Sequence, residues 1–537
     1  MSNDRLMARR ARIDTYQQPV VYLRSDCPVC RAEGFEAQAQ VELICGARHL
    51  LAILNHVSGE WLHTHELALS DVAWSLLGAQ EGDLVEVRHP PLLESTTHLR
   101  AKVHGQPFGY EALRSLMEDV SHGRVPDIQL ASLITLCAGK AVDHAETVAL
   151  TRAMVDVGER LVWDRSPVMD KHCIGGLPGN RTTLVVVPIV AALGVTMPKT
   201  SSRAITSAAG TADVMEVLAP VDLGLAAMRR VVERQQACIV WGGNTGISPA
   251  DDILIRVERP LGLDSEGLLV ASVLSKKVAV GSQGVLIDLP VGPLTKVRSI
   301  DAAVALSRSL TTVGAELGLR VQTVFTDGAA PVGRGIGPAL EAMDVMSVLE
   351  RAPGAPADLR ERALRLAGLI LEMAGKAAQG AGQALARQVL DDGRALARFI
   401  DICEAQGGMR VPPKAAQTHV VAAHASGVVV SIDTRLLARA AKLAGAPRDA
   451  AAGASLHAQI GDRVQVGQPL LTLHAQGRGA LDYALGFMRT QMPMVRIEEA
   501  AGWSRPLPGG PLFSAGRSAG RPARRLPRRS WHAHTGS

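Results

Sequence analysis

Short apolar runs alternate with longer stretches of helical spacing between residues 162 and 400, and glycine-rich turns separate them. Two of these runs are Val285-Leu286-Ile287 and Val321-Gln322-Thr323-Val324. Strand-like runs that alternate with helical stretches are typical of folds in which helices cover a sheet. The pattern therefore predicts an α/β layered core, and we place it over residues 162–410.

Further domains are expected before this core, because 537 residues with 47% hydrophobic content exceed what a single core can use. Alternating stretches at 41–44 and 84–87 predict a small β-rich N-terminal domain over residues 1–90. Residues 91–161 carry apolar side chains at helical spacing and predict a helical domain. We expect a helix at about 224–240 to join that helical domain.

Two further segments follow the core. Strand-and-turn stretches around a helical segment predict a compact C-terminal α+β domain over residues 411–495. Residues 496–537 are dominated by Pro, Gly, Ser and Arg without periodicity, which predicts a disordered basic tail. Seven arginines and no acids lie between positions 505 and 529. The net charge of +5 therefore comes from the tail, and the remainder of the chain is near neutral (5 − 7 = −2). The whole chain is thus expected to be a multidomain α/β protein.

The composition indicates which kinds of partner and which cellular location to expect. Aromatic residues make up only 3%, too few for a stacking surface, and we expect no specific nucleic-acid partner. The sequence has no run of eighteen apolar residues without polar breaks, so we expect no membrane span. The seven cysteines are odd in number and sparse, and the first sixteen residues lack the apolar segment of a signal peptide. These features favour a reducing, cytoplasmic location.

A Cys-x-x-Cys pair, Cys27 and Cys30, resembles half of a structural zinc site. Cys45 and His49 lie close enough in sequence to complete four ligands. The pair lacks a second tight Cys-x-x-Cys or His partner, however, so two reduced cysteines in a turn are the favoured interpretation. We expect no metal site.

The stretch from Asp170 to Asn180 combines a lysine, a histidine and a glycine-rich turn. We expect a strand to end at Val168-Met169 and the turn to follow it. Such a turn directs backbone N–H groups at an anion, and Lys171 adds a positive charge beside the titratable ring of His172. The spacing matches neither the Walker pattern nor the dinucleotide fingerprint.

A second stretch, from Lys199 to Asp213, crowds six hydroxyl side chains, two cations and small residues together. Hydroxyls and backbone amides bind phosphate oxygens, and Arg203 can grip them in a bidentate manner. A helix is expected from Thr211 to Leu218. The two stretches together predict a phosphate site.

These two stretches resemble the paired signature of the thymidine phosphorylase family, which includes the AMP phosphorylases. A third match is Ala271-Ser272-Val273-Leu274-Ser275-Lys276-Lys277, and the resemblance covers roughly residues 60–495. It implies an α/β core of the nucleoside phosphorylase type. It also implies a catalytic histidine, a proton donor of the AMP phosphorylase branch, and ligand-contacting positions. The catalytic positions are His172 and Asp264, and the phosphate- and substrate-binding positions are Lys171, Gly176, Ser201, Ser202, Arg203, Ala204, Ile205, Thr206, Ser207, Thr211, Ser272, Lys276 and Lys296.

Two positions depart from the family pattern. Cys173 stands where both branches usually have serine, which removes one hydroxyl from the phosphate site. Glu258 stands where thymidine phosphorylases place an arginine against the pyrimidine carbonyl, with Arg256 and Arg259 as neighbours. The stretch from Ile255 to Pro260 and the N-terminal β unit instead look like the AMP phosphorylase branch.

The resemblance implies an enzyme of nucleotide salvage that converts thymidine and phosphate to thymine and 2-deoxyribose 1-phosphate. Inorganic phosphate would be its co-substrate, with no cofactor, and the enzyme would be a homodimer or higher homo-oligomer. One alternative is a nucleoside 5′-monophosphate phosphorylase, which gives a free base and ribose 1,5-bisphosphate. A phosphoribosyltransferase and a non-catalytic nucleotide-binding regulator remain further alternatives.

Overall fold

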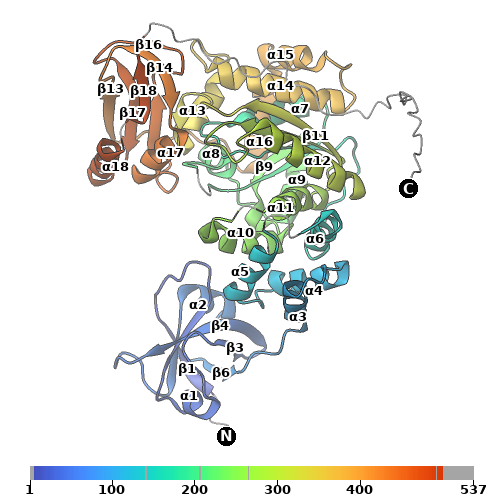
Figure 1. Cartoon of the computed structure of the whole chain (residues 1–537), viewed down its shortest axis with the longest axis vertical. Coiled ribbons are helices and arrows are strands. Elements are labelled where there is room, and N and C mark those ends of the chain that lie inside the picture. Colours follow the sequence, from blue (N-terminus) through green and yellow to red (C-terminus); the bar gives the residue numbers. More distant parts are fainter. Residues whose placement is uncertain (1–4, 139–141, 205–206, 264, 492, 500–537) are drawn as a thin grey trace, which may run out of the picture.

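The computed structural model describes residues 5–138, 142–204, 207–263, 265–491 and 493–499. Figure 1 shows an elongated molecule, with the N-terminal barrel at one end and the C-terminal domain beside the α/β core at the other. The tail beyond residue 499 lies outside the described residues, so its predicted disorder stays a prediction.

The N-terminal domain is a closed six-stranded barrel with strand order β1-β5-β2-β4-β3-β6. Buried and less buried side chains alternate along β3, as the period of two in a strand requires. Closure pairs every strand on both sides and leaves no open sheet edge. Its elements are β1 (Arg5–Arg10), β2 (Val20–Arg24), α1 (Pro28–Glu33), β3 (Gln40–Cys45), β4 (Arg48–Val57), β5 (Glu66–Leu69), α2 (Asp71–Leu77) and β6 (Leu84–Arg88).

A helical unit follows, built from α3 (Thr97–Val103), α4 (Tyr110–Ser121), α5 (Asp127–Leu136) and α6 (His144–Asp156). Asp143 caps α6 in a reciprocal capping box with Glu146. Two later helices, α10 (Pro249–Leu261) and α11 (Glu266–Ala279), pack on this unit, and their apolar side chains share one core with it. The structure differs from our expectation for the helix near 224–240: α9 (Leu225–Gln235) packs mainly against β9 and α16 on the α/β side. Amphipathic spacing predicts a buried face but does not say which partner buries it.

The α/β core contains five strands whose neighbours run parallel. One sheet has the order β11-β10-β7, a second pairs β8 with β9, and a parallel bridge between Val168 and Thr196 links the two. Helix α7 (Thr182–Ala191) is buried along all ten residues, which explains its continuous apolar sequence. The strands are β7 (Met169–Cys173), β8 (Met197–Ser201), β9 (Ala237–Trp241), β10 (Gly284–Val291) and β11 (Arg320–Asp327), and the further helices are α8 (Thr211–Leu218), α12 (Ile300–Glu316), α13 (Pro338–Leu349), α14 (Ala357–Met373), α15 (Gly382–Asp391) and α16 (Arg394–Gln406).

The C-terminal domain holds two small antiparallel sheets and two helices. Its β15 pairs with β12 (Gly335–Ile336) of the core, so one sheet runs from the core into this domain. The chain is thus a multidomain protein of mixed α/β class, and this prediction is confirmed. The elements of the domain are β13 (Gln417–Ala422), β14 (Gly427–Ile432), α17 (Thr434–Leu443), β15 (Gly453–Leu456), β16 (Arg463–Val464), β17 (Pro469–Ala475), α18 (Arg478–Thr490) and β18 (Val495–Glu498).

Within the described ranges, the helices are too short or too polar to cross a membrane.

Candidate active site

The carboxyl ends of the five core strands lie at one edge, because neighbouring strands run parallel. Open parallel sheets bind their ligands at this edge. The sequence predicted a strand ending at Met169, but β7 begins there and runs to Cys173. The charged residues Asp170, Lys171 and His172 therefore belong to the strand itself and not to the turn that follows it.

Asp170 is the centre of a buried cluster of charges. Its carboxylate is fully buried and lies 2.7 Å from the ammonium of Lys277 and 3.6 Å from that of Lys199. The backbone N–H of Lys171 also donates to it at 2.6 Å. Burial lowers the pKa of Lys199 to about 7, an effect that Asp170 opposes and Lys277 reinforces. One carboxylate therefore holds two buried lysines, and one of the two is close to losing its proton at neutral pH.

His172 follows this cluster on β7 and is kept neutral. Burial lowers the pKa of its imidazole well below the ordinary value, and the positive charges of nearby lysines add to the effect. A neutral ring can donate one hydrogen bond and accept one, but it carries no second proton to give away. The lysines concerned are Lys277, Lys199, Lys276 and Lys171.

Two consecutive aspartates of α10 face a lysine of α11. The carboxylate of Asp251 contacts the ammonium of Lys276. Burial alone would lower the pKa of Lys276, but Asp251 and Asp252 outweigh it and raise the pKa, which keeps the ammonium charged. Asp252 is partly exposed to solvent, but the protein around its carboxyl group displaces enough water to raise its pKa to about 6. The positive charge of Lys276 opposes this rise, and the negative charge of Asp251 adds to it. Ser272 lies one turn before Lys276 on the same helix face.

The turn after β7 is held close to the loop that follows β10. The backbone N–H of Lys296 donates to the Gly175 carbonyl at 3.3 Å, and a Cβ on Gly175 would come within 2.8 Å of the Pro290 ring. Gly176 adopts a left-handed backbone (φ 62°), which a larger residue would strain. The Lys296 side chain is exposed beside this turn.

Lys171 and Cys173 lie on either side of His172 along β7 and meet polar groups from the next helix. The Lys171 ammonium is buried and donates to the Thr182 hydroxyl at 2.8 Å at the start of α7. The Asn180 amide donates to the Cys173 sulfur at 3.2 Å. Burial raises the pKa of the Cys173 thiol to about 12, so this cysteine stays protonated.

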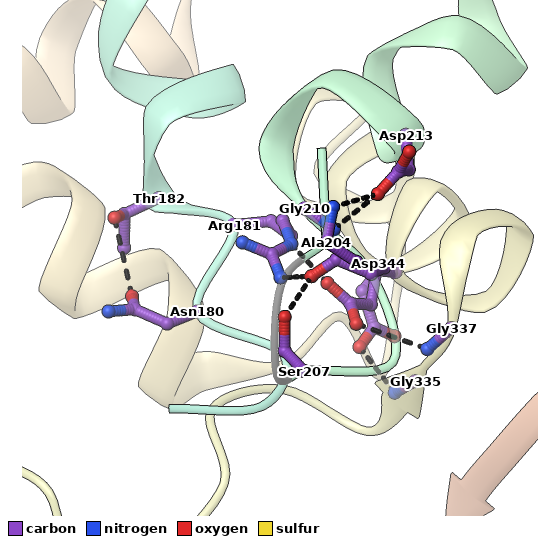
Figure 2. A network of polar contacts seen from close by, with 12 residues as sticks. Asn180, Arg181, Thr182, Ala204, Ser207, Gly210, Asp213, Gly335, Gly337 and Asp344 are labelled. Carbon is purple, nitrogen blue, oxygen red and sulfur yellow. Dashed lines mark hydrogen bonds and ion pairs between the residues drawn. The ribbon is translucent and has the colours of Figure 1, made fainter. Parts of the chain in front are cut away.

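The loop between β8 and α8 is shaped by internal pairs. Asp213, in the first turn of α8, accepts hydrogen bonds from the backbone N–H groups of Ala204 and Gly210, each at 2.7 Å (Figure 2). The Arg203 guanidinium forms two hydrogen bonds with Glu216, contacts Asp213 at 3.3 Å and stacks on the Trp241 ring. The structure therefore places Arg203 as a brace for its own loop.

A second arginine closes this loop from the other side. The guanidinium of Arg181, which Figure 2 labels, donates to the carbonyl oxygen of Ala209. The same side chain pairs with the fully enclosed carboxylate of Glu341 on α13. The Ser207 hydroxyl donates to the same Ala209 carbonyl at 2.7 Å. Two segments of the core thus fix the path of the loop that leads to α8.

One buried hydroxyl at the sheet edge lacks a partner. The Oγ atom of Ser201, the last residue of β8, is inaccessible to solvent and makes no hydrogen bond within the described part of the protein. A buried polar atom without a partner costs about 1–3 kcal/mol. A ligand that accepts this hydrogen bond would recover that cost. Thr211 begins α8 on the far side of the same loop and is partly exposed.

Comparisons with known proteins place the chain in a family. Models of the glycosyl transferase family match at residues 96–158 (helical bundle domain) and 165–396 (a/b domain), and a pyrimidine nucleoside phosphorylase C-terminal domain matches at 428–494. A protein named "putative thymidine phosphorylase 2" from Acidovorax sp. (strain JS42) is 60% identical over 93% of this chain and 97% of its own length. The chain belongs to the thymidine phosphorylase family. It is therefore a pentosyltransferase of the nucleoside phosphorylase type, as the sequence predicted.

Other family members and one solved structure are also similar. A "putative thymidine phosphorylase" from Hahella chejuensis (strain KCTC 2396) is 51% identical over 92% of this chain and 98% of its own length. The anthranilate phosphoribosyltransferase of Thermus thermophilus aligns with a TM-score of 0.47 and 21% identity, over 57% of this chain and 98% of that chain.

The structure brings most of the predicted site residues to the carboxyl edge or to the helix that faces it. Three of them lie at or near the carboxyl ends of core strands: Lys171 and His172 on β7, and Ser201 on β8. Lys276 is close enough to His172 for its charge to lower the pKa of the imidazole. Ile205, Thr206 and Asp264 lie outside the described residues. The remaining predicted positions lie in the turns, loops and helix that frame this edge: Gly176, Ser202, Arg203, Ala204, Ser207, Thr211, Ser272 and Lys296.

Sequence reasoning missed the buried acids and two lysines that organise the site. Asp170 and Lys277 are 107 residues apart in sequence, so no local motif joins them. The sequence signal that could have found the two lysines is their position in the matched stretches. Lys199 is the first residue of the second stretch, and Lys277 is the last residue of the third. Among the described residues, no group of three or more His, Cys, Asp or Glu is arranged so that it could hold a metal ion.

Proposed function

We propose that the chain catalyses phosphorolysis of thymidine, giving thymine and 2-deoxyribose 1-phosphate. The observation that carries the proposal is the gathering of four lysines around His172 at the carboxyl edge of a parallel sheet. Phosphorolysis brings a phosphate anion to C1′ while the base leaves with negative charge, so fixed positive charge stabilises both reaction partners. The names of the family members support the choice of thymidine as the first substrate to test.

The phosphate would bind beside the turn at Gly175-Gly176. Lys171 is near enough to His172 to affect its pKa, and the unpaired Ser201 hydroxyl supplies a donor at the neighbouring strand end. The glycine turn allows close approach of an anion to the backbone. These groups hold the nucleophile in position, and positioning is a large part of the rate that such transfers require.

The departing base would be stabilised by Lys276. Its ammonium stays charged between Asp251 and Asp252, so it can face a base that becomes anionic as the glycosidic bond breaks. The neutral imidazole of His172 can donate one hydrogen bond to the sugar or base, but at neutral pH it is not an acid that protonates the base. The pKa of Asp252, raised to about 6, brings this carboxyl group near the working range of a general acid.

A nucleoside 5′-monophosphate is the second candidate substrate. Arg256 forms a bidentate pair with Asp127, at 2.6 and 2.7 Å, and is therefore engaged away from a base carbonyl. Glu258 stands where the resemblance implies a pyrimidine-binding arginine. The loop at 202–207 and the exposed Lys296 would then hold the 5′-phosphate. Asp264 would act as the proton donor in that branch.

The reaction proposed here needs no metal or organic cofactor, since lysine ammonium groups supply the positive charge. We further propose that the enzyme is cytoplasmic and works as a homodimer or larger homo-oligomer on small-molecule substrates. A phosphoribosyltransferase would instead use magnesium and diphosphate.

A substrate panel tests the proposal. Thymidine, uridine, cytidine, AMP, CMP and UMP are each incubated without phosphate, with inorganic phosphate, and with diphosphate and magnesium, and free base is measured by chromatography. Release of thymine that depends on phosphate supports the first candidate, and release only from monophosphates supports the second. Release that requires diphosphate and magnesium would show a phosphoribosyltransferase, and no release from any compound would support a regulator.

A further inference from the structure

The N-terminal barrel holds a pair of cysteines that the proposed reaction does not use. Cys27 precedes α1, and Cys30 lies in the first turn of that helix. Figure 1 places α1 at the end of the molecule remote from the α/β core. Any chemistry of this pair is therefore separate from the phosphorolysis site.

The two sulfurs are held side by side by the start of the helix. Cys27 is the N-cap residue, and its Sγ accepts a hydrogen bond from the Cys30 backbone N–H at 3.2 Å. Its carbonyl oxygen accepts from the Arg31 N–H at 3.1 Å, which fixes the first turn. Pro28 occupies the first helical position, where its preset φ favours this geometry. The Cys30 thiol is close enough to donate to the Cys27 sulfur as well.

This arrangement divides the protons unequally between the two thiols. Donation from the Cys30 thiol, aided by backbone N–H groups and opposed by burial, lowers the pKa of Cys27. The same contact, together with burial, raises the pKa of Cys30. The nearest acid, Asp26, is paired with Arg24 through two hydrogen bonds of 2.8 Å. Cys27 is therefore the more easily ionised of the two thiols.

The other cysteines differ from Cys27 in this respect. Burial raises the pKa of each of them, which keeps the thiol protonated and slow to react. They are Cys45, Cys137, Cys173, Cys238 and Cys403.

We propose that Cys27 and Cys30 are a redox-active dithiol that closes to a disulfide on reaction with hydrogen peroxide. The Cys27 thiolate attacks one peroxide oxygen, the O–O bond breaks, and the departing hydroxide takes up a proton to leave as water. The sulfur of Cys30, giving up its proton, attacks the resulting sulfenic acid and expels a second water. Two electrons pass from the sulfurs to the peroxide, and a dithiol reductant restores both thiols once the barrel is unfolded.

Geometry and burial decide the kind of oxidant. The 3.2 Å hydrogen bond from the Cys30 backbone N–H to the Cys27 sulfur holds the two residues together, and a disulfide requires its Cα atoms to lie about 4.4–6.8 Å apart. Cys27 is 0% and Cys30 4% exposed, so a disulfide carried by another protein cannot reach either sulfur in the folded barrel. A molecule the size of water is therefore the expected oxidant.

The test uses the intact native protein and follows each cysteine separately. Protein treated with hydrogen peroxide is denatured, its free thiols are alkylated, and its peptides are weighed by mass spectrometry. We expect the peptide with Cys27 and Cys30 to lose two hydrogens and escape alkylation, to recover both thiols with dithiothreitol after denaturation, and to react more slowly as the pH falls. The other five cysteines should still be alkylated at that time.

Two variants give matched controls. In Cys30→Ser the disulfide cannot form, so Cys27 should accumulate as a sulfenic acid that dimedone traps, whereas Cys45→Ser in the same barrel should behave as wild type. The proposal is overturned if wild-type Cys27 and Cys30 remain alkylatable while other cysteines are oxidised. It is equally overturned if Cys27 proceeds to sulfinic acid without forming the disulfide. Neither result bears on the phosphorolysis proposal.

Discussion

The ammonium of Lys277 lies 2.7 Å from the carboxylate of Asp170, and neither side chain reaches solvent. Asp170 comes from β7 and Lys277 from α11, so the pair joins the core sheet to the helix that also carries Lys276. The two helices α10 and α11 belong by packing to the helical unit. This ion pair therefore fixes the position of α11 relative to the carboxyl edge of the core sheet.

Asp170→Asn should strongly destabilise the protein. The change leaves Lys277 and Lys199 buried without a counter-charge, and loss of one partner of a buried pair costs about 3–5 kcal/mol. Urea denaturation measures the free energy of unfolding. The double variant Asp170→Asn with Lys277→Met should lose less than the sum of the two single changes. Equal and additive losses would show that the two side chains do not interact.

Because of Lys199, the free energy of unfolding of the protein should increase as the pH becomes alkaline. In the unfolded chain its pKa returns to the ordinary 10.5, while burial holds it at about 7 in the folded protein. Between these values the unfolded chain binds more protons, so the free energy of unfolding increases as pH rises from about 7 to about 10.5. Lys199→Met should flatten this slope, and Lys414→Met, at an exposed position, should leave it unchanged. An unaltered slope in Lys199→Met would contradict the assignment.

Arg203 and Glu216 should behave as one unit. Because the guanidinium braces the loop before α8, Arg203→Lys and Glu216→Gln should both raise the KM for phosphate, and the double variant should be little worse than either one. Steady-state kinetics with varied phosphate checks this. A large effect of Arg203→Lys together with a silent Glu216→Gln would show instead that the arginine binds phosphate directly.

Cys173→Ser should improve phosphate use. The thiol is a poor hydrogen-bond donor, and burial raises its pKa and keeps it protonated, whereas a serine hydroxyl supplies the donor that the family resemblance implies at this position. One neutral hydrogen bond is worth about 0.5–1.5 kcal/mol, or about 2- to 12-fold in KM for phosphate. Cys173→Ala serves as the control and should not show the gain. A higher KM in the serine variant would place the thiol away from phosphate.

Local signals in the sequence predicted many elements well. The helix Thr211–Leu218 has the bounds expected from the sequence, and the helices α3 to α6 fall within the range 91–161 that was predicted to be helical. β7 was misplaced because Asp170, Lys171 and His172 look unlike a buried strand. Their charges are satisfied only by residues such as Lys277, which tertiary folding brings from far along the chain.

The matched motifs predicted which residues form the candidate site. They did not predict the charge states and pairings of those residues. The motifs indicated His172 as a catalytic histidine, but the burial and the lysines that keep its ring neutral become visible only in three dimensions. The motifs also indicated Arg203 as a phosphate ligand, and its pairing with Glu216 depends on the helix it faces. The closed order of the barrel strands likewise depends on pairings between distant segments.

The central claim is that phosphate itself becomes bonded to the sugar at C1′. Phosphorus NMR of the enzyme with thymidine and inorganic phosphate follows this bond directly. The account predicts that the phosphate signal is replaced by that of 2-deoxyribose 1-phosphate in step with thymine release, and that Lys276→Met slows both together. Thymine release with no sugar phosphate formed, or release at the same rate without phosphate, would contradict it.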